Sequence, residues 1–427
     1  MAHFLLLSFP AQGHINPTVQ LAKRLTRTGA HVTFATTVYA HRRMIKSTSQ
    51  DGLSYASFSD GYDDGMKPTD SLKDYMLQLK DVGPRSVSDL IHTLADEGCP
   101  VTCVIYILLP WAADVASTLH IPSVLLWMQP AAVLAIYYHY FHGCDNLITS
   151  CKKDATSSIE LPGLPLLSVH TSLHFLAFEQ INLPSFISMK NSSKPKVLVN
   201  TINALEGDAM KAVDKLDTIA IGPLIPSAFL DERETSDKAV AADLLPENQM
   251  VEILNGLVES GRPFLWVIRP AENGAETDTD TEFWKNLIAT EEIKQGLVVQ
   301  WYSQVEVLSH PSVGCFMSHC GWNSVSESLT LGVPMVGFPQ WADQPTNIKM
   351  VESVWKAGVR ARVNEDGVLE GGEVKRSLDL VMGGDEGEEM KKNAMKWRDL
   401  AMEAGSENGS LNKNIRAFVE EMTARRP

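Results

Sequence analysis

One segment of this chain, residues 301–344, holds most of the polar side chains whose types and spacing could do chemistry. Within it an apolar, strand-like run over residues 314–318 stops at His319, and helical periodicity resumes three residues later. Asn323 and Ser324 therefore fall in the first turn of the predicted helix, where unpaired N–H groups and the helix dipole favour a negative charge. With side-chain hydrogen bonds added by His319 and Ser324, this turn is suited to a diphosphate.

Two other parts of the segment place flat or polar side chains after predicted strands. Trp301 follows the strand 297–299, where an exposed indole can stack on a flat ring, although an aromatic in the core is the alternative. Asp343 and Gln344 follow the strand 335–338 and its proline turn. A simple helix cap would be the better interpretation of the helix start by itself. The surrounding motif, which includes Trp301, Asp343 and Gln344, instead favours a binding site at this helix start.

A second candidate site follows the first apolar run, residues 3–9, where the chain reads PAQGHINP. Gly13 permits a tight turn there, and Pro17 suits the first position of a helix. His14 then lands at the carboxyl end of the first strand, with a pKa near neutrality that suits a general base. A lone histidine in a loop is more often structural, so this site needs further support.

Apolar, β-rich runs alternate with amphipathic helical stretches along the chain, the pattern of parallel α/β sheets. The expected strands are 3–9, 31–37, 53–58, 101–106, 123–127, 197–200, 218–221, 264–268, 297–299, 314–318, 335–338 and 359–362. The expected helices include 17–27, 71–94, 111–119, 130–142 and 411–422. A chain of 427 residues exceeds one ordinary core, so we expect two domains joined by the polar, proline-containing stretch 222–246.

Composition and missing motifs exclude several classes of protein. A net charge of −15 argues against nucleic-acid binding, which needs clustered Lys and Arg. The six cysteines show neither a CxxC pair nor zinc spacing and fit a reducing cytosol. The first apolar run is short and breaks at Pro10, so it is expected to be a strand rather than a signal peptide, and no run is long enough for a membrane span. No GxGxxG or GxxxxGK[ST] follows a strand, which disfavours a nicotinamide dehydrogenase or a P-loop ATPase.

Residues 301–344 resemble, without a gap, the donor-binding signature of plant UDP-dependent glycosyltransferases of family 1. The string PAQGHINP resembles the segment that carries their catalytic base, and residues 58–62, 199–201 and 261–269 echo the branch with anthocyanin 5-O-glucosyltransferases and hormone glucosyl-ester-forming enzymes. The resemblance implies the GT-B fold, two facing Rossmann-like domains. We expect an acceptor-binding domain over 1–225, a linker over 226–246 and a UDP-sugar-binding domain over 247–427. Its C-terminal helix can return to the N-terminal domain.

The resemblance also implies roles for individual residues of the donor site. The indole of Trp301 stacks on uracil and the backbone of Tyr302 pairs with the edge of the base. Ribose is bound by Gln304 and Glu327, the second of which can accept hydrogen bonds from both hydroxyl groups. The remaining residues expected to bind UDP-sugar are His319, Trp322, Asn323, Ser324, Asp343 and Gln344, where Trp322 closes over the sugar and the last two residues bind glucose hydroxyls. The residues expected to bind the acceptor are Gln12, Trp127, Gln129 and Tyr137, although aromatics at such spacing are usually core.

The implied reaction is an inverting transfer from UDP-glucose, the co-substrate, to a hydroxyl or carboxylate of a small plant metabolite such as a phenolic, a flavonoid or a hormone acid. His14 is the expected base, and neither a metal nor another cofactor is expected. Asp278-Thr-Asp280 has the DxD form of metal-dependent transferases, but an acidic, Thr-rich solvated loop explains it better. We expect a cytoplasmic monomer whose partners are the acceptor and the UDP-sugar, with no nucleic acid or membrane.

The chain departs from the family pattern in two places. Relatives orient the histidine with an aspartate after the fourth strand, where this chain has Ile107 in a run that is one residue short. Relatives also have an apolar strand after the linker whose loop contacts the phosphates, but residues 222–246 contain no such run. The first departure predicts a preference for acidic acceptors. Together they leave an alternative: a nucleotide-sugar-binding protein with weak or lost turnover.

Overall fold

The computed structural model describes residues 2–44, 51–67, 69–151, 157–168, 194–226, 245–268 and 295–424. Its contacts divide the chain into two compact units. Unit 1 consists of Met1–Ser236, Trp341–Thr346 and Leu400–Pro427, and unit 2 consists of Asp237–Gln340 and Asn347–Asp399. Most of the expected linker, residues 227–244, and the Asp278-Thr-Asp280 string lie outside the described residues.

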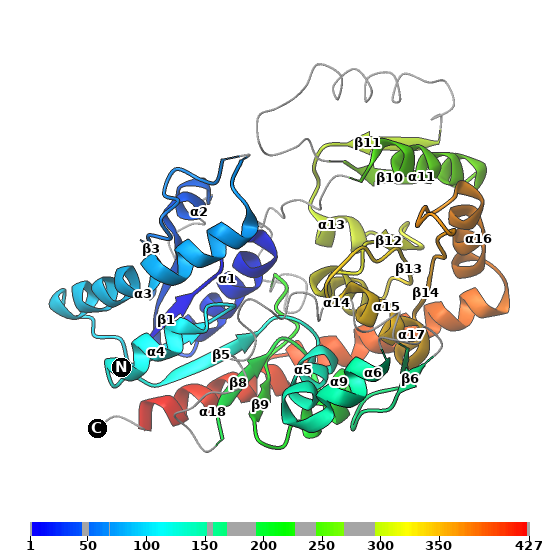
Figure 1. Ribbon diagram of the computed structural model, residues 1–427. Coiled ribbons are helices and arrows are strands. Elements are labelled where there is room, and N and C mark those ends of the chain that lie inside the picture. The colour runs from blue at the N-terminus through cyan, green and yellow to red at the C-terminus, as the bar shows by residue number, and fades with distance from the viewer. Residues whose placement is uncertain are drawn as a thin grey trace. The chain divides into compact units, whose positions relative to one another are not determined.

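Unit 1 is built on a seven-stranded parallel sheet with the order β3-β2-β1-β4-β5-β8-β9 (Figure 1). Its strands are β1 (His3–Leu7), β2 (His31–Thr37), β3 (Leu53–Phe58), β4 (Cys103–Tyr106), β5 (Ser123–Trp127), β8 (Lys196–Val199) and β9 (Asp217–Ala220). A short antiparallel pair is formed by β6 (Ser158–Ile159) and β7 (Leu167–Ser168). The strand order reverses between β1 and β4, and in doubly wound sheets ligands bind at the carboxyl ends of strands at such a point.

Helices connect these strands as the alternating pattern predicts. They are α1 (Gln12–Thr26), α2 (Val38–Arg43), α3 (Leu72–Asp96), α4 (Trp111–Thr118), α5 (Ala131–His139), the π-helix η1 (Tyr140–Cys144), α6 (Asp145–Cys151), α9 (Asn203–Lys211) and α18 (Ser410–Ala424). One expected start is wrong: α1 begins at Gln12, so Pro17 lies inside the helix. The Ala11 carbonyl accepts hydrogen bonds from the N–H groups of His14 and Ile15, and these bonds form a turn of helix before the proline.

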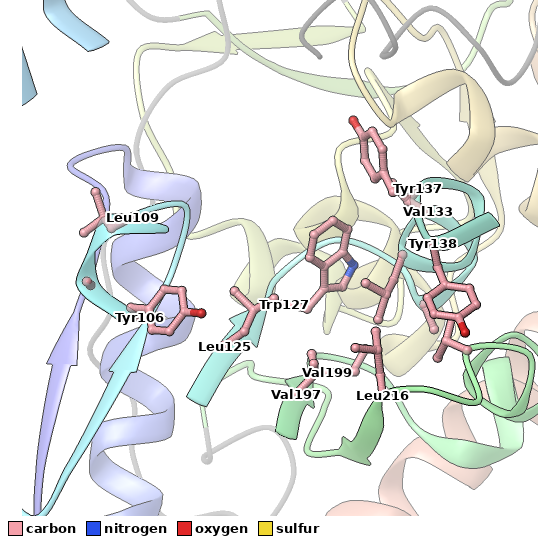
Figure 2. Packing of buried hydrophobic residues seen from close by; sticks show 14 of the residues in the cluster. Tyr106, Leu109, Leu125, Trp127, Val133, Tyr137, Tyr138, Val197, Val199 and Leu216 are labelled. Carbon is pink, nitrogen blue, oxygen red and sulfur yellow. The ribbon is translucent and has the colours of Figure 1, made fainter. Parts of the chain in front are cut away.

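The core of unit 1 has two layers because successive strand residues point to opposite faces of the sheet. On one face Leu5, Tyr106 and Trp127 pack with α3, α4, α5 and α9, and Figure 2 shows part of this layer. On the other face Phe4 and Leu6 pack with α1 and α18. Both faces are covered, which explains why the strands read as nearly continuous apolar runs.

The last helix, α18, returns to unit 1, as the resemblance implied. The ring of Phe418 lies 5.6 Å from that of Phe4, measured between centroids. The Asn414 side chain donates a hydrogen bond of 2.8 Å to the Ala220 carbonyl at the end of β9. Lys196 on β8 pairs with Glu421 at 3.0 Å. Figure 1 shows α18 in red beside β8 and β9.

The second half of the chain contains two small parallel sheets, β10-β11 and β12-β13-β14. The strands are β10 (Phe264–Val267), β11 (Gly296–Val299), β12 (Phe316–Ser318), β13 (Met335–Gly337) and β14 (Gly358–Arg360). The helices are α11 (Glu247–Glu259), α13 (Gln304–Leu308), α14 (Trp322–Leu331), α15 (Gln344–Met350), the π-helix η4 (Val351–Trp355), α16 (Gly371–Met382) and α17 (Gly384–Gly405). All of these strand pairs are parallel, as the expected α/β architecture requires.

Within the described part of unit 2, no strand joins β10 to β12. The sheet is divided into pieces of two and three strands, and apolar side chains of the smaller piece are exposed to water. Leu265 and Val267 are each 39% exposed, and Leu297 is 61% exposed. This is the result expected if the strand that relatives carry after the linker is lacking, since its neighbours then lose their apolar cover.

The divided sheet predicts an unequal response to two matched substitutions. Leu126→Ala on β5 removes a side chain that is 1% exposed and should cost roughly 2–5 kcal/mol of unfolding free energy. Leu297→Ala on β11 removes a side chain that is already in water, so it should cost less than about 1 kcal/mol. Urea unfolding followed by circular dichroism measures both. A cost at Leu297 as large as that at Leu126 would mean that another segment covers β11.

Candidate active site

The turn between β12 and α14 is held in place by hydrogen bonds on both sides. The Cys320 N–H donates to the Ser318 hydroxyl at 3.2 Å, and the Asn347 side chain donates to the Cys320 carbonyl at 2.8 Å. Cys320 has a φ of 67°, in the left-handed region that non-glycine residues rarely adopt. The backbone therefore turns sharply at the end of β12 and enters α14 at a fixed position.

The first turn of α14 is organised as the sequence predicts. Gly321 is the N-cap residue, and no side chain caps the helix there, so neither Asn323 nor Ser324 acts as the N-cap. A Cβ atom placed on Gly321 would lie 2.6 Å from the Nε2 atom of His319. The half-buried imidazole of His319 therefore lies directly against the start of the helix. Imidazole, helix N–H groups and the Ser324 hydroxyl together form a surface suited to phosphate oxygens.

A hydrogen-bonded group of three polar side chains lies beside this turn. The Gln304 amide donates to the Glu327 carboxylate at 2.6 Å and to the Ser324 hydroxyl at 3.2 Å. Burial raises the pKa of Glu327 to about 7, and the hydrogen bond from Gln304 opposes this shift. The expected ribose ligands, Gln304 and Glu327, are thus brought together, in contact with the expected phosphate ligand Ser324.

The two residues expected to bind the base are exposed. Trp301 is 38% exposed and Tyr302 is 48% exposed, just after the end of β11. A core position for Trp301 is therefore excluded, because a core aromatic would be covered. Helix α13 begins three residues after Trp301, at Gln304. The exposed indole is therefore close in sequence to the hydrogen-bonded group of Gln304, Ser324 and Glu327.

Three further residues expected at the sugar are largely buried. Trp322 is 4% exposed and packs against Trp355 with ring centroids 5.9 Å apart, so the indole that we expected to close over the sugar lies in the interior. Asp343 and Gln344 are 8% and 5% exposed. The Gln344 side-chain oxygen accepts a hydrogen bond of 3.1 Å from the Trp341 N–H, which stabilises the turn before α15.

His14 lies in the first turn of α1, at the carboxyl end of β1. Its half-buried imidazole packs edge-to-face near Phe9, at 6.0 Å between centroids. Burial lowers the pKa of His14 to about 4. Among the described residues, no hydrogen-bond partner meets its buried Nδ1 atom. The imidazole is therefore neutral at pH 7, and no carboxylate in the described part of the chain accepts a hydrogen bond from Nδ1 to stabilise the protonated form.

The orienting aspartate of relatives is expected after β4, and this chain has Ile107 at that position. Ile107, at the end of β4, is 1% exposed and packs in the core layer beneath α1 and α18. The next residue, Leu108, has a φ of 51°, unusual for a non-glycine residue. The backbone is therefore strained directly after Ile107.

The residues expected to bind the acceptor have different environments. Trp127 and Tyr137 are 4% and 3% exposed and pack edge-to-face in the core, with ring centroids 6.0 Å apart. Figure 2 shows both side chains. Gln129, in the turn between β5 and α5, is half-buried. The side chain of Gln12 lies outside those described. The two aromatics therefore support the turn from within, and Gln129 carries the accessible polar group.

Some contributors to the site were missed from the sequence. Asn347, on α15, fixes the turn between β12 and α14, and the ring of Phe9 lies near the imidazole of His14. Phe9 lies within the recognised first run, but its ring contact depends on the start of α1. The sequence around Asn347 gives no sign of its role, because its hydrogen-bond partner, the Cys320 carbonyl, is 27 positions away.

Comparison with known proteins identifies the class. The model of the family "UDP-glucoronosyl and UDP-glucosyl transferase" matches residues 240–403. Crocetin glucosyltransferase, chloroplastic, of Gardenia jasminoides is 47% identical over 463 positions, covering 98% of this chain and 97% of that protein. Anthocyanidin 3-O-glucoside 5-O-glucosyltransferase of Verbena hybrida is 43% identical, covering 99% of both chains. The crystal structure of Os79 from O. sativa with UDP aligns with a TM-score of 0.82 and 30% identity, covering 98% of this chain and 100% of that one.

The chain therefore belongs to the plant UDP-dependent glycosyltransferases of family 1, with the GT-B fold. It is a glucosyltransferase that uses UDP-glucose as co-substrate and acts on small plant metabolites, and it resembles the anthocyanin 5-O-glucosyltransferases. The 463 aligned positions exceed the 427 residues of this chain, so the Gardenia protein has residues that this chain lacks.

No helix among the described residues is both long enough and apolar enough to cross a membrane. No group of three or more His, Cys, Asp or Glu side chains within the same residues is arranged to hold a metal ion.

The pKa of Glu327 predicts how donor binding depends on pH. A carboxylate accepts hydrogen bonds from ribose hydroxyls best when ionised, and protonation near pH 7 removes that advantage. The affinity for UDP-glucose should therefore fall about tenfold between pH 8 and pH 6, as expected for one proton bound with this pKa. Calorimetric titration measures it, and the diphosphate of UDP-glucose has no ionisation of its own in this range. Glu327→Gln should bind more weakly with a flat pH profile; a wild-type step that persists in this variant would contradict the assignment.

The contact between His319 and Gly321 predicts a second effect. Gly321 has a φ of −59°, which alanine adopts without strain, so Gly321→Ala should act only by displacing the imidazole. Loss of one charge-assisted hydrogen bond should weaken UDP binding about tenfold. Gly372→Ala on α16 is the control, because a Cβ there meets nothing within 4 Å. Equal UDP affinities in the two variants would show that His319 does not contact the diphosphate.

Proposed function

We propose that this protein transfers the glucosyl group of UDP-glucose to acidic acceptors, with inversion at the anomeric carbon. The observation that carries the proposal is the preformed group of Gln304, Ser324 and Glu327 beside the open start of α14. In this proposal Trp301 and Tyr302 bind uracil. Gln304 and Glu327 bind ribose, while Asn323, Ser324 and His319 bind the diphosphate.

The proposed reaction is a single displacement. His14 takes the acceptor proton while the acceptor oxygen attacks the anomeric carbon from the face opposite UDP. The bond from that carbon to the diphosphate oxygen breaks, and its electron pair leaves with UDP. Helix N–H groups and His319 stabilise the charge that develops on the leaving group. An α-linked donor thus gives a β-glucoside, with Asp343 and Gln344 as the proposed ligands of the glucose hydroxyls.

The environment of His14 favours acceptors that ionise readily. The neutral imidazole of His14, whose conjugate acid has a pKa of about 4, takes a proton from a phenol, whose pKa is about 10, only with a large free-energy cost. A carboxylic acid, with a pKa of about 4, is already ionised at neutral pH and needs no base. One relative is named for crocetin, a carboxylic acid, and another for an anthocyanidin glucoside, a phenol. The proposal therefore includes both carboxylic acids and phenols as acceptors, and carboxylic acids are expected to react faster.

The proposal also assigns the domains: residues 1–225 for the acceptor, 226–246 as linker and 247–427 for UDP-glucose, in a cytoplasmic monomer. The chloroplastic relative makes a plastid the alternative compartment. Among acceptor ligands we retain Gln12 and Gln129 as direct contacts, with Trp127 and Tyr137 behind them.

A panel of phenols and carboxylic acids incubated with UDP-glucose tests the proposed activity. Mass spectrometry should detect one added hexose per acceptor, in the β configuration. The alternative, a nucleotide-sugar-binding protein with weak turnover, is favoured by the divided sheet and by the lack of a described partner for His14 Nδ1. UDP binding without any glucosylated product would establish it.

The role of His14 predicts a difference between acceptors. His14→Ala should lower kcat/KM at least about a hundredfold for a phenol, which needs a base. For the benzoic acid of the same skeleton, the loss should stay within about tenfold, because the nucleophile is already ionised. Steady-state rates at pH 7 with both acceptors measure this ratio. Equal losses for the two acceptors, or a wild-type preference for aliphatic alcohols, would contradict the proposed chemistry.

A further inference from the structure

Glu206 is a buried carboxylate that the proposed reaction does not use. It lies on α9 with 3% of its surface exposed. Its Oε2 atom accepts a hydrogen bond of 2.9 Å from the Ala131 N–H, and its Oε1 atom accepts one of 3.0 Å from the Ala132 N–H. Burial raises the pKa of Glu206, and these backbone donors oppose the shift. The carboxylate is thus held by the backbone of another element.

Ala131 and Ala132 are the first two residues of α5, so their N–H groups have no partner within the helix. The N-cap position of α5 is Pro130, which has no side-chain group to accept a hydrogen bond. Glu206 supplies the cap from 75 positions away in the sequence. Its own backbone leaves helical geometry, with φ −135° and ψ 27°, which kinks α9 at this residue.

The segment fixed in this way includes the turn that carries Gln129. On its other side, the Trp127 indole N–H donates to the Pro130 carbonyl at 2.9 Å. Trp127, at the end of β5, also packs against Tyr137 on α5. The turn between β5 and α5 is therefore held from three directions, by the sheet, by the indole and by the Glu206 carboxylate. Gln129 is its half-buried polar side chain.

We propose that Glu206 is a positioning residue for acceptor binding, acting through the Gln129 turn. The inference rests on the proposed function, in which Gln129 contacts the acceptor. Both carboxylate oxygens are occupied by consecutive N–H groups, so the carboxylate sets the direction in which α5 begins. The direction of α5 in turn sets where the Gln129 side chain lies.

Glu206→Gln tests the proposal with little change in volume. Its amide oxygen can accept from one of the two N–H groups, whereas its NH₂ group opposes the other. The KM for the acceptor should rise about tenfold, with the KM for UDP-glucose unchanged within about twofold. Asp208→Asn is the matched control, because that carboxylate lies on the same helix with 87% of its side chain exposed. It should change neither KM.

A double-mutant cycle with Gln129→Ala separates positioning from simple stabilisation. If Glu206 acts through Gln129, Glu206→Gln should raise the acceptor KM in the wild-type background and leave it unchanged in the Gln129→Ala background. A cap that only stabilises the fold would lower the melting temperature and the active fraction without moving KM, and this would overturn the proposal. Equal increases in KM in both backgrounds would also overturn it.

The proposed function can fail independently, if the wild-type protein glucosylates no acceptor. Equilibrium dialysis of a labelled phenol or benzoic acid against the same four proteins would then replace KM by a dissociation constant. The same pattern is expected: weaker binding in Glu206→Gln alone, and no additional loss when Gln129 is already alanine. Acceptor binding that does not differ between wild type and Glu206→Gln would overturn the inference.

Discussion

The proposed nucleotide site is held together by one side chain, the Gln304 amide. Gln304 begins α13, which follows β11, whereas Ser324 and Glu327 lie on α14, which follows β12. Those two strands belong to separate sheets in the described part of unit 2, so no backbone ladder connects them. The hydrogen bonds from Gln304 to Ser324 and Glu327 join the two pieces at the place where the nucleotide is proposed to bind. A side-chain contact thus does what a continuous sheet would otherwise do.

Unit 1 shows the opposite arrangement, and the contrast has chemical consequences. Its seven-stranded sheet is continuous and covered on both faces, so His14 is delivered to the switch point between β1 and β4 by a rigid framework. Rigid placement does not make a strong base, however. Without a described partner at Nδ1, the half-buried imidazole of His14 has a pKa of about 4, and the proposed reaction therefore favours acceptors that are already ionised.

Much of this could be predicted from the sequence because it depends on local periodicity. Alternating runs located the twelve main strands to within a few residues, and the break after His319 correctly placed Asn323 and Ser324 in the first turn of α14. The divided sheet could also be anticipated, because no apolar run follows the linker. Local patterns could not show what depends on packing between distant segments. The burial of Trp322 against Trp355 and the capping of α5 by Glu206 are of this kind.

Calorimetric titration of UDP into the wild-type protein and a Gln304→Ala variant tests the central claim most directly. Gln295→Ala, an exposed glutamine just before β11, serves as the control. If the Gln304 amide assembles the nucleotide site, the wild-type protein and the control should bind one UDP with equal affinity. The Gln304→Ala variant should then bind at least about tenfold more weakly. Equal affinity in all three proteins, or no binding to the wild-type protein, would contradict the account.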